Sequence, residues 1–75
     1  MTISEKELIK LISKNIKEKP ENINIHSKRS EFKNWDSLTN VRIIMELQNR
    51  IGKNKDLSHL MNFKNIKELL KKINI

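Results

Sequence analysis

The chain has no cysteine, one glycine, one proline and three aromatic residues among its 75 residues. Without cysteine it can form neither a disulfide nor a thiolate metal site, which fits a reducing compartment. One glycine cannot supply the glycine-rich loop that binds phosphate in nucleotide-binding proteins. No apolar run approaches the roughly 20 residues of a membrane helix, and the N-terminus lacks the apolar core of a signal peptide. We therefore expect a soluble, cytoplasmic protein that does not insert into membranes.

Acidic residues are also scarce, since nine Asp and Glu stand against sixteen Lys and Arg, for a formal net charge of +7. Such a charge raises nucleic acid or an anionic membrane as partners. Residues 36–51, however, carry two basic and two acidic residues, so the excess lies on either side of this segment. The length predicts one domain, residues 1–75, whose small core leaves no room for a large buried active site.

The first helix is predicted by a capping signal followed by an apolar stripe. Ser4 and Glu7 have the spacing of a capping box. One helical face then gathers the aliphatic residues Leu8, Leu11, Ile12 and Ile16. The opposite face gathers a solvated stripe of Lys6, Lys10, Lys14 and Lys17. The pattern predicts a helix over roughly residues 4–17, ended by Pro20, which has no N–H and disfavours helical geometry at Lys19.

The segment from Lys19 to Trp35 shows neither a helical nor a strand period for any useful length. A loop this long is unusual in so small a domain unless it is functional or held down. Isolated Ile23, Ile25 and Phe32 are the apolar residues that we expect to hold it against the helices. A short strand at Ile23–Ile25 would have no partner strand.

The strongest helical signal covers residues 36–51. Asp36 and Ser37 have side-chain oxygens that can accept hydrogen bonds from the first free backbone N–H groups. Gly52, the only glycine, can adopt the left-handed conformation that ends a helix. The apolar residues form one arc of the helix, with Ile43, Ile44, Leu47 and Ile51 at its centre and Val41, Met45 and Leu38 continuing it. The polar residues Thr39, Arg42, Glu46, Asn49 and Arg50 fill the opposite arc.

Two further helices are predicted after Gly52. Asp56 can cap a short helix that contains Leu57, Leu60 and Met61. Asn65 can cap a last helix whose apolar residues recur at helical spacing, namely Ile66, Leu69, Leu70 and Ile73. Lys71 and Lys72 near its end suit the helix dipole. The predicted fold class is all-α, with three main helices, one short helix and a long first loop.

No catalytic or metal-binding constellation emerges, so we expect a protein that is not an enzyme and has no metal site. His26 and His59 lie in separate polar stretches, and neither has an Asp, Glu or His four residues later to form a metal pair. One function that the composition leaves open is that of a small basic helix-turn-helix protein that binds nucleic acid. Arg42 and Arg50 could serve its recognition helix, but Glu46 lies beside them and a loop of about eighteen residues precedes that helix.

Asp36-Ser37-Leu38, followed by a helix with Val41, Ile44, Met45 and Leu47 and by a glycine just past its end, resembles the acyl carrier protein family. The resemblance covers almost the entire chain, including Pro20-Glu21-Asn22-Ile23 in the first loop and Trp35 before the motif. It implies an acyl-carrier-like four-helix bundle. It also implies that the Ser37 hydroxyl carries a covalent 4′-phosphopantetheine cofactor, transferred from coenzyme A by a phosphopantetheinyl transferase. The thiol of this arm would hold acyl or aminoacyl groups as thioesters.

The resemblance further assigns roles around Ser37. Asp36 and Leu38 would belong to the cofactor site, with Asp36 presenting it to the transferase. Leu38, Val41, Arg42 and Met45 would contact the partners, which are acyl- or aminoacyl-activating and acyl-transferring enzymes; Val41 and Met45 could also join the core. We expect a monomer whose helix core consists of Ile43, Leu47 and Ile51, packed with Leu8, Ile12, Leu69 and Ile73.

One departure from the family narrows the expected pathway. Carriers of fatty acid biosynthesis are usually strongly acidic along this helix, whereas this chain has Arg42, Gln48 and Asn49 there and a net charge of +7. We therefore expect a dedicated carrier for a specialised pathway rather than for general fatty acid synthesis. Modification of a surface polysaccharide or lipid, a small polyketide or peptide route, and amino-acid activation are the candidates.

Overall fold

The computed structural model describes residues 3–52 and 60–74, and within them the chain is helical with no strand. The elements, in chain order, are α1 (Glu5–Ile16), the 3-10 turns η1 (Pro20–Asn22) and η2 (Arg29–Glu31), α2 (Ser37–Ile51) and α4 (Ile66–Ile73). The all-α prediction is confirmed, and the strand considered at Ile23–Ile25 does not form. The predicted short helix from Asp56 lies largely outside the described residues. Two of its residues, Leu60 and Met61, are described and have helical backbone.

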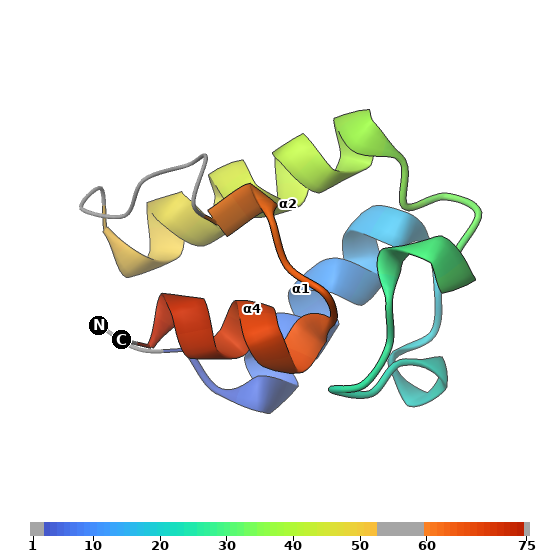
Figure 1. The fold of residues 1–75 in the computed structure, drawn as a ribbon, viewed down its shortest axis with the longest axis horizontal. Helices are drawn as coiled ribbons and strands as arrows, with labels where there is room; N and C mark the ends of the chain where they lie inside the picture. The colour runs from blue at the N-terminus through green and yellow to red at the C-terminus, as the bar shows by residue number, and fades with distance from the viewer. Residues whose placement is uncertain (1–2, 53–59, 75) are drawn as a thin grey trace.

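In Figure 1, α2 runs across the top of the view, α4 lies below it and α1 passes behind α4, with the long first loop at one end of the three helices. Two hydrogen bonds hold the terminal segments together. Ile3 N donates to Asn74 Oδ1 at 3.1 Å, and Asn74 Nδ2 donates to Ile3 O at 3.2 Å. No helix among the described residues is both long enough and apolar enough to cross a membrane.

The limits of α1 follow from its two caps. The predicted capping box forms, because Ser4 Oγ accepts from Glu7 N at 3.2 Å and Ser4 N donates to Glu7 Oε1 at 3.4 Å. The helix ends at Ile16, one residue before the predicted limit. Its end is set by Lys17, which has a left-handed backbone (φ 57°) and whose N–H donates to Ser13 O, and not by Pro20, which starts η1.

The first loop is held down as predicted, although in two ways. Ile23 is buried, whereas Ile25 and Phe32 are half-buried. In addition, the carbonyls of Ile25 and Ser27 accept hydrogen bonds from Lys67 N at 2.7 Å and from Ile66 N at 3.2 Å. These donors are among the N–H groups that the first turn of a helix leaves unpaired. The loop backbone therefore satisfies the start of α4, beside the predicted cap in which Asn65 Oδ1 accepts from Glu68 N.

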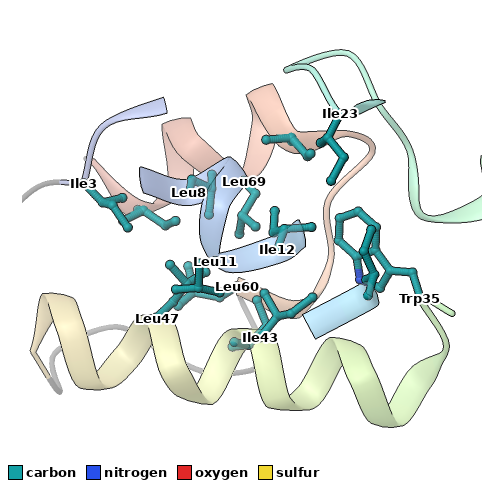
Figure 2. Packing of buried hydrophobic residues seen from close by; sticks show 14 residues of the cluster. Ile3, Leu8, Leu11, Ile12, Ile23, Trp35, Ile43, Leu47, Leu60 and Leu69 are labelled. Carbon is teal, nitrogen blue, oxygen red and sulfur yellow. The ribbon is translucent and has the colours of Figure 1, made fainter. Parts of the chain in front are cut away.

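The core lies between the three helices and is almost entirely aliphatic (Figure 2). Its buried members are Ile3, Leu8, Leu11, Ile12, Ile16, Ile23, Trp35, Ile43, Ile44, Leu47, Leu60, Ile66, Leu69 and Ile73. Six of the seven predicted core residues are among them. Ile51 is the exception, because the last turn of α2 leaves it half-buried at the margin of the core.

Gly52 ends α2, as its position in the sequence predicts. Its N–H donates to Gln48 O at 3.0 Å, and its φ of 97° is in the positive range that glycine accepts without steric cost. Its ψ of 173°, however, is extended and not the left-handed helical value that we expected. This combination of angles is essentially restricted to glycine, so the residue is more specifically required than a left-handed cap would be.

Candidate functional site

The start of α2 separates the two side chains that the sequence offered as caps. Asp36 is the N-cap, and its Oδ1 accepts from Thr39 N at 2.9 Å. Ser37 is the first helical residue and is exposed. Its hydroxyl makes no hydrogen bond to any residue that the structure describes. Because Asp36 occupies the cap position, the Ser37 hydroxyl is not needed to cap α2.

A serine in the first turn of a helix is a suitable place to attach a phosphate. The first N–H groups of the helix lack partners within it, and the helix dipole is positive at this end. A phosphate group there is stabilised by both effects. Ser37 also follows an exposed cap residue and precedes exposed Leu38, so its oxygen can be reached from solution.

Asp36 keeps its negative charge at this helix end. The hydrogen bonds from the backbone N–H and the side chain of Thr39 hold the pKa of Asp36 below its ordinary value, with a smaller contribution from the positive charge of Arg42. A carboxylate is therefore present beside Ser37 at neutral pH. It forms no hydrogen bond with the Ser37 hydroxyl.

A buried polar pair fixes the backbone on either side of Ser37. Trp35 Nε1 donates to Asn40 Oδ1 at 3.0 Å, and the two residues are only 4% and 1% exposed. The Trp35 ring lies 6.2 Å from that of Phe32 and 6.0 Å from that of Phe63. In Figure 2 it closes the end of the core next to the start of α2. Ser37 thus lies between two residues, Trp35 and Asn40, that are anchored in the core.

Asn40 was not among the residues that the sequence singled out. Its position gave a signal, because Asn40 falls in the middle of the arc that also carries Ile43, Ile44 and Leu47, where a polar residue is unexpected. The structure buries all four. Asn40 Nδ2 has no hydrogen-bond partner, so the amide is satisfied only on its oxygen side.

The four residues assigned to partner contact lie on one solvent side of α2, which we call the outer face: Leu38, Val41, Arg42 and Met45. Leu38 is 62% exposed and Met45 is 55% exposed, and these are the exposed large hydrophobic side chains of the described residues. Arg42 is exposed and Val41 is half-buried. The sequence had allowed Met45 to join the core, but the structure leaves it exposed.

Glu46 lies elsewhere than the sequence indicated. We expected it on the exposed arc beside Arg42, but it is half-buried against α1. Its Oε2 lies 2.7 Å from Lys14 Nζ and 3.7 Å from the Arg50 guanidinium, and its Oε1 accepts from Asn15 Nδ2 at 3.3 Å. The hydrogen bond from Lys14 is the main cause that lowers the pKa of Glu46. Lys14, one of the four lysines of the predicted solvated stripe, thus joins α1 to α2.

Other kinds of site find little support in the described part of the chain. It contains no group of three or more His, Asp or Glu side chains that could hold a metal ion. His26 is exposed, and His59 lies outside the described residues. An open pocket of about 220 Å³ is lined by Asn65, Lys67, Glu68 and Lys71 at the start of α4. Asn65 and Glu68 are already occupied there in capping that helix.

Comparison of the chain with protein-family models, with curated proteins and with solved structures finds no match in any of the three.

Proposed function

We propose that this protein is a carrier whose Ser37 hydroxyl bears a 4′-phosphopantetheine arm. The arm would hold acyl or aminoacyl intermediates as thioesters while separate enzymes act on them. The proposal includes the finer fold, an acyl-carrier-like bundle in which a short helix near Leu60 completes three main helices. It also includes a monomeric state and a cytoplasmic location.

The observation that carries the proposal is the division of roles between Asp36 and Ser37. If Ser37 capped α2, its oxygen would accept a hydrogen bond from a backbone N–H. Capping alone would then explain why a serine stands at this position. Here Asp36 makes that hydrogen bond, at 2.9 Å to Thr39 N, and Ser37 stays exposed and unbonded. An exposed hydroxyl on a rigid helix start, next to N–H groups that favour phosphate, is what an attachment point requires.

Attachment of the arm to Ser37 is a phosphoryl transfer from coenzyme A. The Ser37 oxygen forms a bond to the phosphorus that carries pantetheine in coenzyme A, the pyrophosphate bond breaks, and the nucleotide part leaves. The hydroxyl proton goes to a base of the transferase, since the described residues place no general base in hydrogen-bonding contact with Ser37. The chain's own contribution is to present the oxygen and to stabilise the phosphodiester with the helix start.

The same geometry explains why the carrier needs no catalytic group of its own. A flexible arm raises the effective concentration of its cargo at a docked enzyme, to about the millimolar range for short links. The catalysis then belongs to the partners, namely the transferase and the enzymes that load, modify and remove the acyl group. A chain without cysteine also offers no protein thiol that would compete for the thioester.

The test is intact-mass spectrometry after incubation with coenzyme A, Mg²⁺ and a broad-specificity phosphopantetheinyl transferase. We expect the mass of one phosphopantetheine group to be added to the wild-type chain and nothing to be added to Ser37→Ala. Ser30→Ala is the matched control, because Ser30 is also exposed but lies in η2. It should be modified as fully as the wild type.

The alternative, a helix-turn-helix protein that binds nucleic acid, is separated by the same experiment. That motif joins its helices by a turn of about three or four residues, whereas residues 17–36 lie between α1 and α2. If several transferases add no mass while the chain binds DNA with strong salt dependence, the carrier proposal is wrong and the alternative replaces it. Absence of both results would indicate an unmodified interaction domain.

A further inference from the structure

The outer face presents apolar area that the chain itself does not use. Leu38 and Met45 lie seven residues apart on α2, which is two turns or about 10 Å along the helix. Both project into solvent, and Leu38 directly follows the exposed serine. Single exposed hydrophobic residues are common; here two of them share one helix face beside the candidate attachment point.

The charge of this face is the more informative feature. Arg42, which lies between Leu38 and Met45, is exposed and makes no salt bridge with any described residue. Two carboxylates lie on or next to the helix, and neither belongs to the outer face. Glu46 is held by Lys14 and Arg50 against α1. Asp36 is exposed at the start of the helix, where it accepts a hydrogen bond from Thr39 N and keeps its negative charge. The outer face itself therefore has apolar side chains and one positive charge, with Asp36 next to its N-terminal edge.

We propose that the outer face docks onto an acidic patch of its partner enzymes, in which Asp or Glu side chains surround an apolar area. Leu38 and Met45 would contact the apolar area, and Arg42 would pair with a carboxylate at its rim. The inference rests on the proposed function, because it takes the partner to be an enzyme that acts on the group at Ser37. Charge complementarity of this kind governs the encounter rate and the choice of partner.

Other occupants fit the face less well. A nucleic acid surface needs several cations for its phosphates, and the outer face has one cation among apolar residues. A second copy of the chain in a two-fold dimer would bring Arg42 toward its own counterpart, between molecules that each carry +7. Binding to a membrane surface would need a broad apolar helix face, but the broad apolar face of α2 is buried in the core.

The test uses the full ¹⁵N-labelled chain and two helix-forming peptides that share one leucine-rich face. One peptide carries Glu and the other Lys at all remaining positions. We expect the Glu peptide to shift the amide signals of Leu38, Arg42 and Met45, with an affinity about tenfold above that of the Lys peptide. Arg42→Glu should reverse the preference. Lys67→Glu, an equal change of charge at an exposed position of α4, should preserve it.

Three results would overturn the inference: equal or tighter binding of the Lys peptide, shifts centred on α1 or α4, or loss of the preference in Lys67→Glu. Anionic lipid vesicles or duplex DNA that shift the outer-face amides where the Glu peptide does not would reassign the surface to that ligand. The titration is repeated on Ser37→Ala, because docking needs no attached group. A chain that binds the Glu peptide but accepts no phosphopantetheine would contradict the proposed function alone, and the reverse pair of results would contradict the docking surface alone.

Discussion

The two sides of α2 differ in what they require from the rest of the chain. The inner side, made of Asn40, Ile43, Ile44 and Leu47, is at most 1% exposed, and Figure 2 shows Ile43 and Leu47 pointing into the core. The outer face leaves Leu38 and Met45 more than half exposed. Apolar residues therefore occur on both sides of one helix, although only one side contributes to folding.

The apolar residues of one amphipathic helix can therefore serve two purposes, folding on one side and binding on the other. In the sequence, Leu38 and Met45 merely extend the arc of Ile43 and Leu47. In the structure the arc divides, because the core reaches only as far as the residues that face α1. Substitutions on the inner side should change stability, whereas those on the outer face should change binding and leave stability almost intact.

The largest contrast is expected between Ile43 and Leu38. Ile43→Ala removes a fully buried side chain and should cost about 2–5 kcal/mol of unfolding free energy. Leu38→Ala should stay within about 0.5 kcal/mol of the wild type, because the side chain is mostly in solvent already. Urea denaturation followed by circular dichroism measures both.

A domain of this size has a total stability of only about 3–5 kcal/mol, so Ile43→Ala could leave too little folded protein to measure. Ile43→Val, with an expected cost of about 0.5–1.5 kcal/mol, then provides the comparison. A loss of stability in Leu38→Ala as large as that in Ile43→Val would refute the division of α2 into two sides.

The sequence predicted the parts of the fold that depend on local signals. The caps at Ser4, Asp36 and Asn65 and the end of α2 at Gly52 follow from short-range hydrogen bonds, so residue type and spacing were sufficient. It failed where long-range packing decides. Glu46 turns toward Lys14, thirty-two residues away in the chain, and no helical period of α2 alone can show this.

For the candidate site, the structure shows that Ser37 is exposed and that the proposed contact residues share one face of α2. The roles that the motif implies for them stay predictions. The pairing of Trp35 with Asn40 was missed, because a hydrogen bond between buried side chains depends on the path of the first loop. That path is set by backbone contacts of Ile25 and Ser27 with α4, which leave no periodic trace in the sequence.

The next largest effect is expected at Asn40, the polar member of the inner side. Asn40→Ala removes the acceptor of Trp35 Nε1 and leaves a buried N–H unpaired, which should cost about 1–3 kcal/mol. The Trp35 fluorescence spectrum should change with it, since the indole loses its hydrogen bond. Asn49→Ala, the same substitution at an exposed position of α2, is the control for a general effect on the helix. Equal stability of Asn40→Ala and the wild type would show that the pair contributes nothing.

A smaller effect is expected at Asp36, where the two sides of α2 meet. Asp36→Ala removes the cap and should lower the melting temperature, whereas Asp36→Asn keeps an acceptor oxygen for Thr39 N and should lower it much less. Because the pKa of Asp36 is lowered in the folded state, its contribution is present at neutral pH and is lost as the pH falls through that lowered value. Thermal unfolding at pH 7 and near pH 2 checks both statements, and an Asn variant as unstable as the Ala variant would contradict the cap.

The smallest effect is expected at Glu46, on the flank between the two sides. Glu46→Gln removes the charge that Lys14 and Arg50 share, and for a partly exposed pair the cost should be below about 1 kcal/mol. The pKa of Glu46 is lower in the folded chain than in the unfolded one. The ionised side chain therefore stabilises the wild type relative to Glu46→Gln at pH values above the ordinary Glu pKa of about 4.3. This advantage over Glu46→Gln should disappear as the pH falls through the folded value, and it should shrink in 1 M salt at neutral pH. Denaturation of both chains across this pH range measures it, with Lys14→Gln as the partner variant of a double-mutant cycle. A coupling energy of zero would show that the ion pair of Lys14 with Glu46 does not stabilise the packing of α1 on α2.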